Sequence, residues 1–208
     1  QVATAGLEPS AISFPLRKIF QKKKDIHIRV CEVKELIATE NSVLTDIGRV
    51  NYDFLVIATG ADTNFYGNQE ILNNAMPMKS VSEALYIRNR VLSNFELALV
   101  TKDEELKKAL LNIVVVGGGP TGVEVSGTLA DMKKTVLPKD YPELDFNLMG
   151  ITLVEAGDRV LKSMSEISSK HAKRFLEKRG VKVLVGIRVA GFDGDTIRFV
   201  NGESIISK

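Results

Sequence analysis

The residues best suited to chemistry form a short glycine-rich segment. This segment follows the aliphatic run 113–116 and precedes a helix-compatible stretch, Val123–Met132. A buried strand, a glycine turn and a helix in this order are the context in which a βαβ unit holds a dinucleotide. The predicted nucleotide-binding residues of the turn are Gly117, Gly118, Gly119, Pro120, Thr121 and Gly122.

Three glycines of the turn have separate predicted roles. Gly117 allows the tight change of direction from strand to helix, and Gly119 lacks a side chain that would keep a diphosphate away from the backbone. Gly122 lets the helix lie close to the strand. The N–H groups at the positive end of the helix would then meet the phosphates. The alternative, an ordinary structural turn, is disfavoured by the strand and helix that flank the motif.

A carboxylate at the end of the next strand indicates which nucleotide is preferred. Glu155 ends the run Ile151–Glu155, where an acid can accept hydrogen bonds from ribose hydroxyls and repel a 2′-phosphate. It follows Gly122 by 33 residues, more than the usual spacing of about 20, because the intervening segment carries two prolines and a polar run. Arg159 is the competing signal for NADP, and an exposed acid at a strand end is the structural alternative. The sequence favours NAD(H).

Composition is that of an ordinary globular chain. Of 208 residues, 44% are hydrophobic and 26% charged, and the net charge of +2 gives no reason to invoke nucleic acid. The basic cluster within residues 17–29 is interpreted as a solvated face, with a membrane-surface or anionic-partner role as the minor alternative. No signal peptide and no apolar run of membrane-spanning length is visible. Cys31, His27 and His171 show no metal-ligand spacing, so no metal site is predicted.

The remaining pattern predicts an α/β fold in two parts, residues 1–78 and 79–208. In the first part, Tyr52–Gly60 is a continuous apolar run, expected to be a strand buried on both faces of a parallel sheet. Residues 61–78 are expected to be mostly loop. In the second part we expect helices over about 82–99 and 101–110, a helix from about 165 closed by Gly180, and a strand at 181–185. A β-meander then turns at 193–195 and 201–202.

Both ends of the chain indicate a longer protein. The sequence starts with Gln1 rather than Met and stops at Lys208 soon after a short strand begins. The first part also lacks the opening βα unit that an open parallel sheet requires. We therefore expect an internal segment.

On these residues the chain resembles the two-dinucleotide-fold flavoprotein oxidoreductases, and within them the type II NADH:quinone oxidoreductases. Tyr52–Gly60 is similar to the segment that returns to FAD, and Val114–Glu124 with Leu153–Asp158 is similar to the NADH domain. The most discriminating run is Val2–Pro9, followed by Ile12 and Pro15-Leu-Arg17. The loop 133–148, with Tyr141-Pro142, also resembles this branch.

The resemblance implies a Rossmann-like NAD(H)-binding domain with a meander, joined to an incomplete FAD-domain portion. It implies NAD(H) and, in the full-length protein, FAD as cofactors, with Ala58, Thr59 and Gly60 on the flavin side. Hydride would pass from NADH to the flavin and electrons to a quinone. The resemblance further implies a cytoplasmic protein, peripheral on the inner face of the membrane, with a homodimer as an open assembly. This segment alone is expected to be inactive and to hold no FAD.

The sequence leaves alternatives open for the role of Glu124 and for the function of the protein. Glu124 is either an acid favourable to the helix dipole or, as the resemblance implies, a catalytic residue beside the nicotinamide and flavin. Alternative functions are a ferredoxin or disulfide reductase of the same superfamily, and a non-catalytic NAD(H)-sensing module. The run Val2–Arg17 disfavours the first, and the segment Val56–Gly60 disfavours the second.

Overall fold

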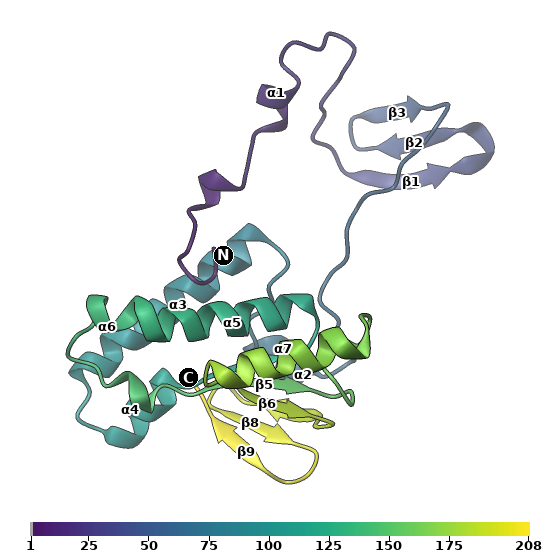
Figure 1. The fold of residues 1–208 in the computed structure, drawn as a ribbon. Helices are drawn as coiled ribbons and strands as arrows, with labels where there is room; N and C mark the ends of the chain where they lie inside the picture. Colours follow the sequence, from purple (N-terminus) through teal and green to yellow (C-terminus); the bar gives the residue numbers. More distant parts are fainter. Residues whose placement is uncertain (1) are drawn as a thin grey trace. The chain divides into compact units, whose positions relative to one another are not determined.

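The computed structural model describes residues 2–208 (Figure 1). The chain divides into two compact units, one made of Gln1–Pro9 and Thr63–Lys208, the other of Ser10–Asp62. The predicted division at residue 78 concerns the domains of a longer protein and stays a prediction.

The larger unit is built on a parallel sheet that carries the glycine turn. Strands β4 (Ile113–Val116), β5 (Ile151–Glu155) and β6 (Lys182–Val185) are hydrogen-bonded in the order β4-β5-β6. Pairing is parallel, with Val116 opposite Val154 and Glu155 opposite Val185. Parallel neighbours need a helical crossover, and α5 (Pro120–Thr135) and α7 (Glu166–Lys178) supply the two crossovers. These helices contact each other and the sheet, as Figure 1 shows. The prediction of a Rossmann-like βαβ fold is confirmed.

Helices α3 (Val81–Val100) and α4 (Glu104–Leu111) complete the core of the larger unit. Apolar residues at helical spacing on α3 face the core. Phe95 of α3, Leu111 of α4 and Leu153 of β5 are fully buried there. Ser80 and Glu83 form a capping box at the start of α3, each accepting a hydrogen bond from the other's backbone N–H. The predictions of these two helices are confirmed with small shifts at their ends.

An antiparallel meander follows the parallel sheet, as predicted. It consists of β7 (Val189–Phe192), β8 (Thr196–Phe199) and β9 (Ser204–Ile206). Ile197 and Phe199 of β8 are buried together with Val154 of β5. This contact closes the second face of the central strand.

Helix α2 (Gln69–Asn74) lies where the sequence predicted loop. The amide side chains of Asn68 and Asn74 donate to the backbone carbonyls of Ala190 (2.8 Å) and Phe192 (3.0 Å) of β7. Six residues are too few for apolar periodicity to reveal a helix. The element depends on these long-range hydrogen bonds, which the sequence pattern does not show.

The long spacing between the glycine turn and Glu155 has the predicted cause. After α5 the chain forms the short helix α6 (Leu137–Asp140) and a 3₁₀ turn, η3 (Phe146–Leu148), before β5 begins. Leu137, Phe146 and Met149 of this excursion are buried in the core. The excursion is therefore a packed part of the unit.

The smaller unit contains an antiparallel sheet of three strands. These are β1 (Val33–Ile37), β2 (Ser42–Thr45) and β3 (Gly48–Asn51), with η2 (Ala38–Glu40) joining the first two. A 3₁₀ turn, η1 (Pro9–Ala11), and helix α1 (Leu16–Ile19) precede the sheet, and Pro15 is the N-cap of α1.

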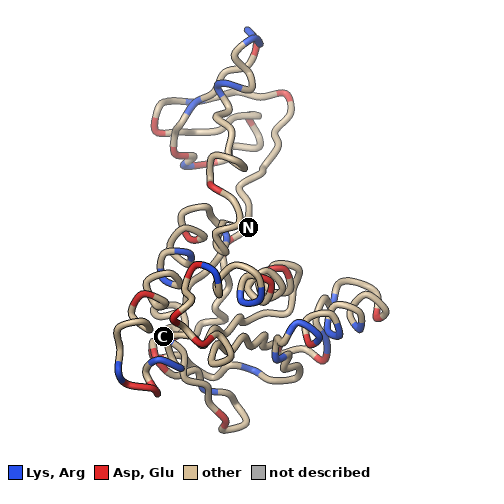
Figure 2. The backbone as a smooth tube through the Cα atoms, turned by 60° about the vertical axis from the view of Figure 1, so that its left-hand side comes forward, with Lys and Arg blue, Asp and Glu red and all other residues tan. Residues whose placement is uncertain are grey.

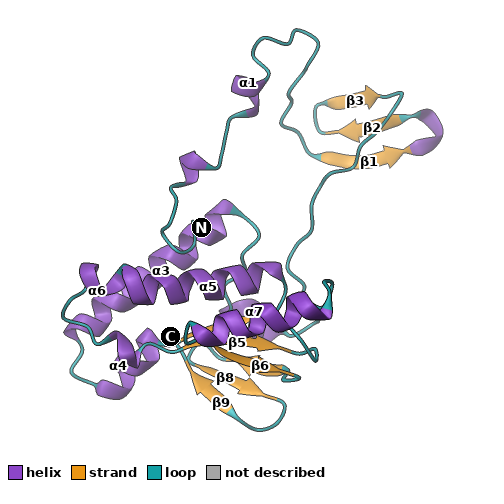
Figure 3. Cartoon of the chain, viewed as in Figure 1, coloured by secondary structure: helices purple, strands orange, loops and turns teal. Residues whose placement is uncertain are grey.

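The prediction of a buried strand over Tyr52–Gly60 is wrong for this chain. The segment has no strand assignment, and Figure 3 draws it as a loop after β3. Phe54 and Val56 are 94% and 86% exposed. A strand buried on both faces of a parallel sheet needs hydrogen-bonded neighbours, and no described strand pairs with these residues. The apolar run therefore stays exposed among the described residues.

Charged residues of both signs are interspersed along the chain (Figure 2). Within residues 2–208, no helix combines the length and apolar character needed to cross a membrane.

Candidate dinucleotide-binding site

The glycine turn begins where β4 leaves the sheet. The N–H of Gly117 donates to the carbonyl oxygen of Val154 (2.8 Å), which extends the ladder between β4 and β5 by one residue. Gly117 then adopts a φ of +111°, a region that side chains rarely enter. This is the tight turn that the sequence predicted for the first glycine.

Gly122 fits only without a side chain. A Cβ atom there would lie 1.9 Å from the carbonyl oxygen of Gly117, far inside van der Waals contact with backbone. Gly122 is buried in the first turns of α5, against the end of β4. The predicted close approach of helix and strand is therefore observed.

Gly119 faces open space in front of the helix. It is the N-cap of α5, and a Cβ atom placed on it would meet no atom within 4 Å. Pro120 occupies the first helical position, where its lack of an N–H costs nothing. No side chain among the described residues caps this helix end, and its first turn carries no acid. The N–H groups of this first turn, including those of Thr121 and Gly122, are the kind that bind an anion.

Glu155 is joined to the turn rather than free at the strand end. Its Oε2 accepts a hydrogen bond from the N–H of Gly118, and its Oε1 accepts one from the N–H of Gly157, both at 2.6 Å. Each carboxylate oxygen retains a second lone pair. Glu155 can therefore accept from ribose hydroxyls while it holds the backbone of the turn.

Two loops that the sequence pattern did not assign to the site, one after β5 and one after β6, complete the surroundings of Glu155. Leu161 donates its N–H to the carbonyl oxygen of Gly118 (2.7 Å), and Gly186 donates to that of Gly157 (2.7 Å). These are backbone contacts made by ordinary residue types. The only sequence signal for them was Gly157, two residues after the acid.

The Arg159 side chain is held by contacts with its own loop and with α7. One guanidinium nitrogen, Nη2, donates to the backbone carbonyl of Lys162 (3.2 Å), and Nη1 lies 3.9 Å from Glu166 of α7. The guanidinium thus contacts the start of α7. To bind the 2′-phosphate of NADP, Arg159 would have to break these contacts.

The other predicted site residues are placed as follows. Glu124 is exposed on the second turn of α5, and its backbone carbonyl accepts from the Thr128 hydroxyl (2.8 Å). Ala58, Thr59 and Gly60 are exposed in the smaller unit, and Gly60 has a φ of +75°. The structure brings together the turn and Glu155. The roles of Glu124 and of residues 58–60 stay predictions.

The described residues contain no cluster of three or more histidine, cysteine or acidic side chains arranged to hold a metal ion.

The sequence profile of the pyridine nucleotide-disulphide oxidoreductase family matches residues 12–206. The chain belongs to this family. Family membership agrees with the glycine turn and with the parallel sheet that carries it.

Curated relatives narrow the resemblance. A type II NADH:quinone oxidoreductase of Mycobacterium tuberculosis, NdhA, is 34% identical over 97% of the chain and 44% of its own length. A second one from the same organism, Ndh, is 29% identical over the whole chain and 46% of its own length. The external alternative NAD(P)H-ubiquinone oxidoreductase B3 of Arabidopsis thaliana is 40% identical over 67% of the chain. The predicted resemblance to this branch is confirmed.

Solved structures show the same fold. NDH2 from Plasmodium falciparum, solved with NADH, superposes with a TM-score of 0.87 over 99% of the chain at 24% identity. The sulfide:quinone oxidoreductase of Aquifex aeolicus superposes with a TM-score of 0.75 at 18% identity. The chain spans less than half the length of these relatives.

Proposed function

We propose that this chain is the NADH-binding segment of a flavin-dependent NADH:quinone oxidoreductase. The observation that carries the proposal is the uncapped start of α5 beside Gly119, with Glu155 held at the neighbouring strand end. The relatives named as NADH:quinone oxidoreductases support the choice of reaction.

The chain's own residues would bind and orient NADH. The first-turn N–H groups of α5 would donate to the diphosphate, whose negative charge the helix dipole favours. Glu155 would accept from the adenosine ribose hydroxyls through its remaining lone pairs. Glu124, exposed one turn further along α5, is proposed to contact the nicotinamide side.

The flavin side would involve Ala58, Thr59 and Gly60. When FAD is bound in the longer protein, it supplies the hydride acceptor and the route for two electrons to quinone. These three residues are exposed in this chain, which fits a surface that a further part of the protein covers.

We also propose where the longer protein acts and how it assembles. The longer protein would act at the inner face of the membrane, where quinone is its electron acceptor, and would be peripheral and cytoplasmic. A homodimer is the assembly to test. The relatives' names support the quinone.

Titration of the purified chain with NADH by calorimetry tests the proposal. We expect one NADH per chain, no bound flavin and no quinone reduction. A chain that fails to bind NADH, or that purifies with stoichiometric yellow flavin, contradicts it. The flavin spectrum of the longer protein separates an oxidoreductase from an NAD(H) sensor.

A further inference from the structure

A pocket of about 520 Å³ lies at the opposite end of α5 from the glycine turn. Helix α5 has 16 residues, so the two ends are about 24 Å apart at 1.5 Å per residue. The volume is within the range of small-molecule sites. All described lining residues belong to the larger unit: the turn 4–6, two residues of α3, and the segment from Thr128 to Tyr141.

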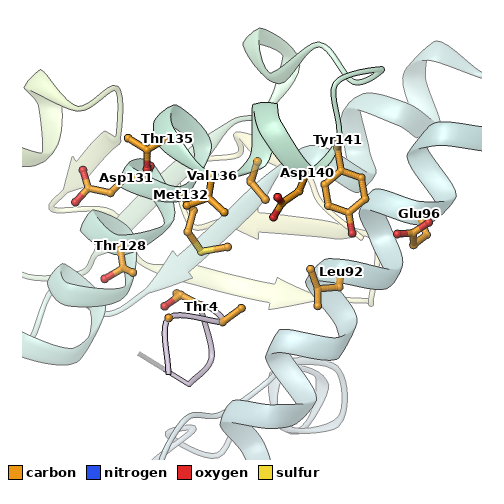
Figure 4. Close-up of a pocket in the computed structure, with 13 residues that line it drawn as sticks. Thr4, Leu92, Glu96, Thr128, Asp131, Met132, Thr135, Val136, Asp140 and Tyr141 are labelled. Carbon is orange, nitrogen blue, oxygen red and sulfur yellow. The ribbon is translucent and has the colours of Figure 1, made fainter. Parts of the chain in front are cut away.

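The inner part of the pocket is apolar. Met132 and Leu137 are 9% and 2% exposed, and Leu92 of α3 and Val136 lie beside them. Figure 4 shows the labelled side chains of α3, of α5 and of the following segment around the hollow. An apolar body of a ligand would contact this floor.

The rim consists largely of hydrogen-bond acceptors. The hydroxyls of Thr128 and Thr135 donate to the backbone carbonyls of Glu124 (2.8 Å) and Asp131 (2.7 Å). Burial and the neighbouring carboxylate of Glu96 raise the pKa of the Tyr141 phenol above its ordinary value. The two threonine hydroxyls have therefore each given their one proton to an internal partner and present lone pairs only.

The rim is also negatively charged. It contains Glu96, Asp131 and Asp140, and no lysine, arginine or histidine occurs among the described lining residues. Asp131 is paired with Arg179 (2.8 Å), whereas Glu96 and Asp140 have no ion pair within residues 2–208. The last turn of α5 carries Lys133 and Lys134, neither of which lines the pocket.

The Tyr141 ring lines the pocket together with Glu96 and has a fixed position. The ring of Tyr141 packs edge-to-face on Phe95, with centroids 5.6 Å apart, and Phe95 is fully buried on α3. The phenol beside Glu96 is thus fixed by the core. Carboxylates beside an apolar floor favour a donor that brings a positive charge and an apolar body together.

We propose that this pocket binds an organic cation consisting of a primary ammonium group on an apolar chain or ring. The ammonium group donates to Glu96 and Asp140 and to the lone pairs of the hydroxyl rim. Its apolar part contacts Leu92, Met132 and Leu137. The site is separate from the glycine turn and takes a ligand of opposite charge.

Three isosteric probes test the proposal on the purified chain: 4-phenylbutylamine, 4-phenylbutanol and 4-phenylbutyrate. We expect the amine to bind, to shift the methyl resonance of Met132, and to bind about tenfold or more tightly than the alcohol, since charge-assisted hydrogen bonds are lost with the alcohol. The carboxylate should not bind. NADH should not displace the amine.

Variants identify the carboxylates. Glu96→Gln and Asp140→Asn should each weaken the amine and leave the alcohol unchanged, and either variant suffices if the other does not fold. Glu105→Gln on α4 is the control, because this acid is 82% exposed and pairs with Lys108 outside the pocket. Equal affinity for the three probes, unchanged amine affinity in both pocket variants, or an unmoved Met132 resonance would each overturn the proposal.

Discussion

Glu155 and Gly118 are joined by a 2.6 Å hydrogen bond, donated by the Gly118 N–H to Oε2 of the carboxylate. The other carboxylate oxygen holds Gly157 at the same distance. One side chain therefore connects the turn after β4 with the loop after β5. The residue proposed to select the nucleotide therefore also holds the shape of the turn.

Glu155→Ala should consequently lower both NADH affinity and stability. Charge-assisted hydrogen bonds contribute about 1.5–3 kcal/mol each, so NADH should bind roughly tenfold to a hundredfold more weakly. Calorimetry and thermal unfolding measure the two effects, and Glu143→Ala, which removes an exposed acid outside the site, is the control. Glu155→Gln keeps one acceptor for Gly118 and should recover part of the stability. Unchanged affinity in a folded Glu155→Ala chain would remove the ribose role.

Gly119 and Gly122 should respond differently to a side chain. Gly119→Val places its Cβ in open space, so the chain should fold but not bind NADH, because the side chain would occupy the position of the diphosphate. Gly122→Ala would put a Cβ 1.9 Å from the Gly117 carbonyl oxygen and should destabilise the fold by about 1–3 kcal/mol or more. Gly127→Ala is the matched control on α5, with its nearest neighbour at an ordinary 3.6 Å. A folded Gly119→Val chain with normal NADH affinity would place the phosphates elsewhere.

Arg159 should not assist NADPH binding in the unmodified chain. Its guanidinium contacts Lys162 and Glu166, so the unmodified chain should prefer NADH. The substitution Glu166→Ala removes one of these contacts. It should free the guanidinium and reduce the difference in affinity between NADH and NADPH, whereas Arg159→Ala should leave the preference for NADH intact. Titration with each nucleotide measures this. Equal affinities in the unmodified chain would contradict the NAD assignment.

Ser80 should contribute to the stability of α3 through the capping box. Its side chain accepts from the Glu83 N–H (3.2 Å), and Glu83 accepts from the Ser80 N–H (2.7 Å). Ser80→Ala should therefore lower the free energy of unfolding by about 1 kcal/mol. Ser93→Ala, an exposed substitution inside the same helix, should lower it little or raise it. Chemical denaturation distinguishes the two, and equal effects would show that the cap contributes nothing.

The sequence predicted what depends on local pattern. The glycine turn, Glu155, α3 and the meander turns follow from spacing, periodicity and turn residues, and the structure places them as expected. It could not predict α2, which long-range amide contacts hold, or the role of Leu161, whose contribution is a backbone N–H. The strand predicted at Tyr52–Gly60 is absent for a different reason. Its apolar pattern requires neighbouring strands, and no strand among the described residues pairs with it.

Tyr141 should report on the pocket through its titration. Burial, and then the hydrogen bond to Glu96 with its negative charge, raise the pKa of the Tyr141 phenol above its ordinary value. Glu96→Gln removes the charge, so the pKa should fall but stay raised by burial. The chain has four tyrosines and no tryptophan, so tyrosinate absorbance measured against Tyr141→Phe isolates this group. Because the folded-state pKa is the higher one, stability should decline as pH rises from about 10, the usual tyrosine value, towards the folded pKa. Tyr141→Phe should lose that part of the decline, and an unchanged pKa in Glu96→Gln would show that the carboxylate does not act on the phenol.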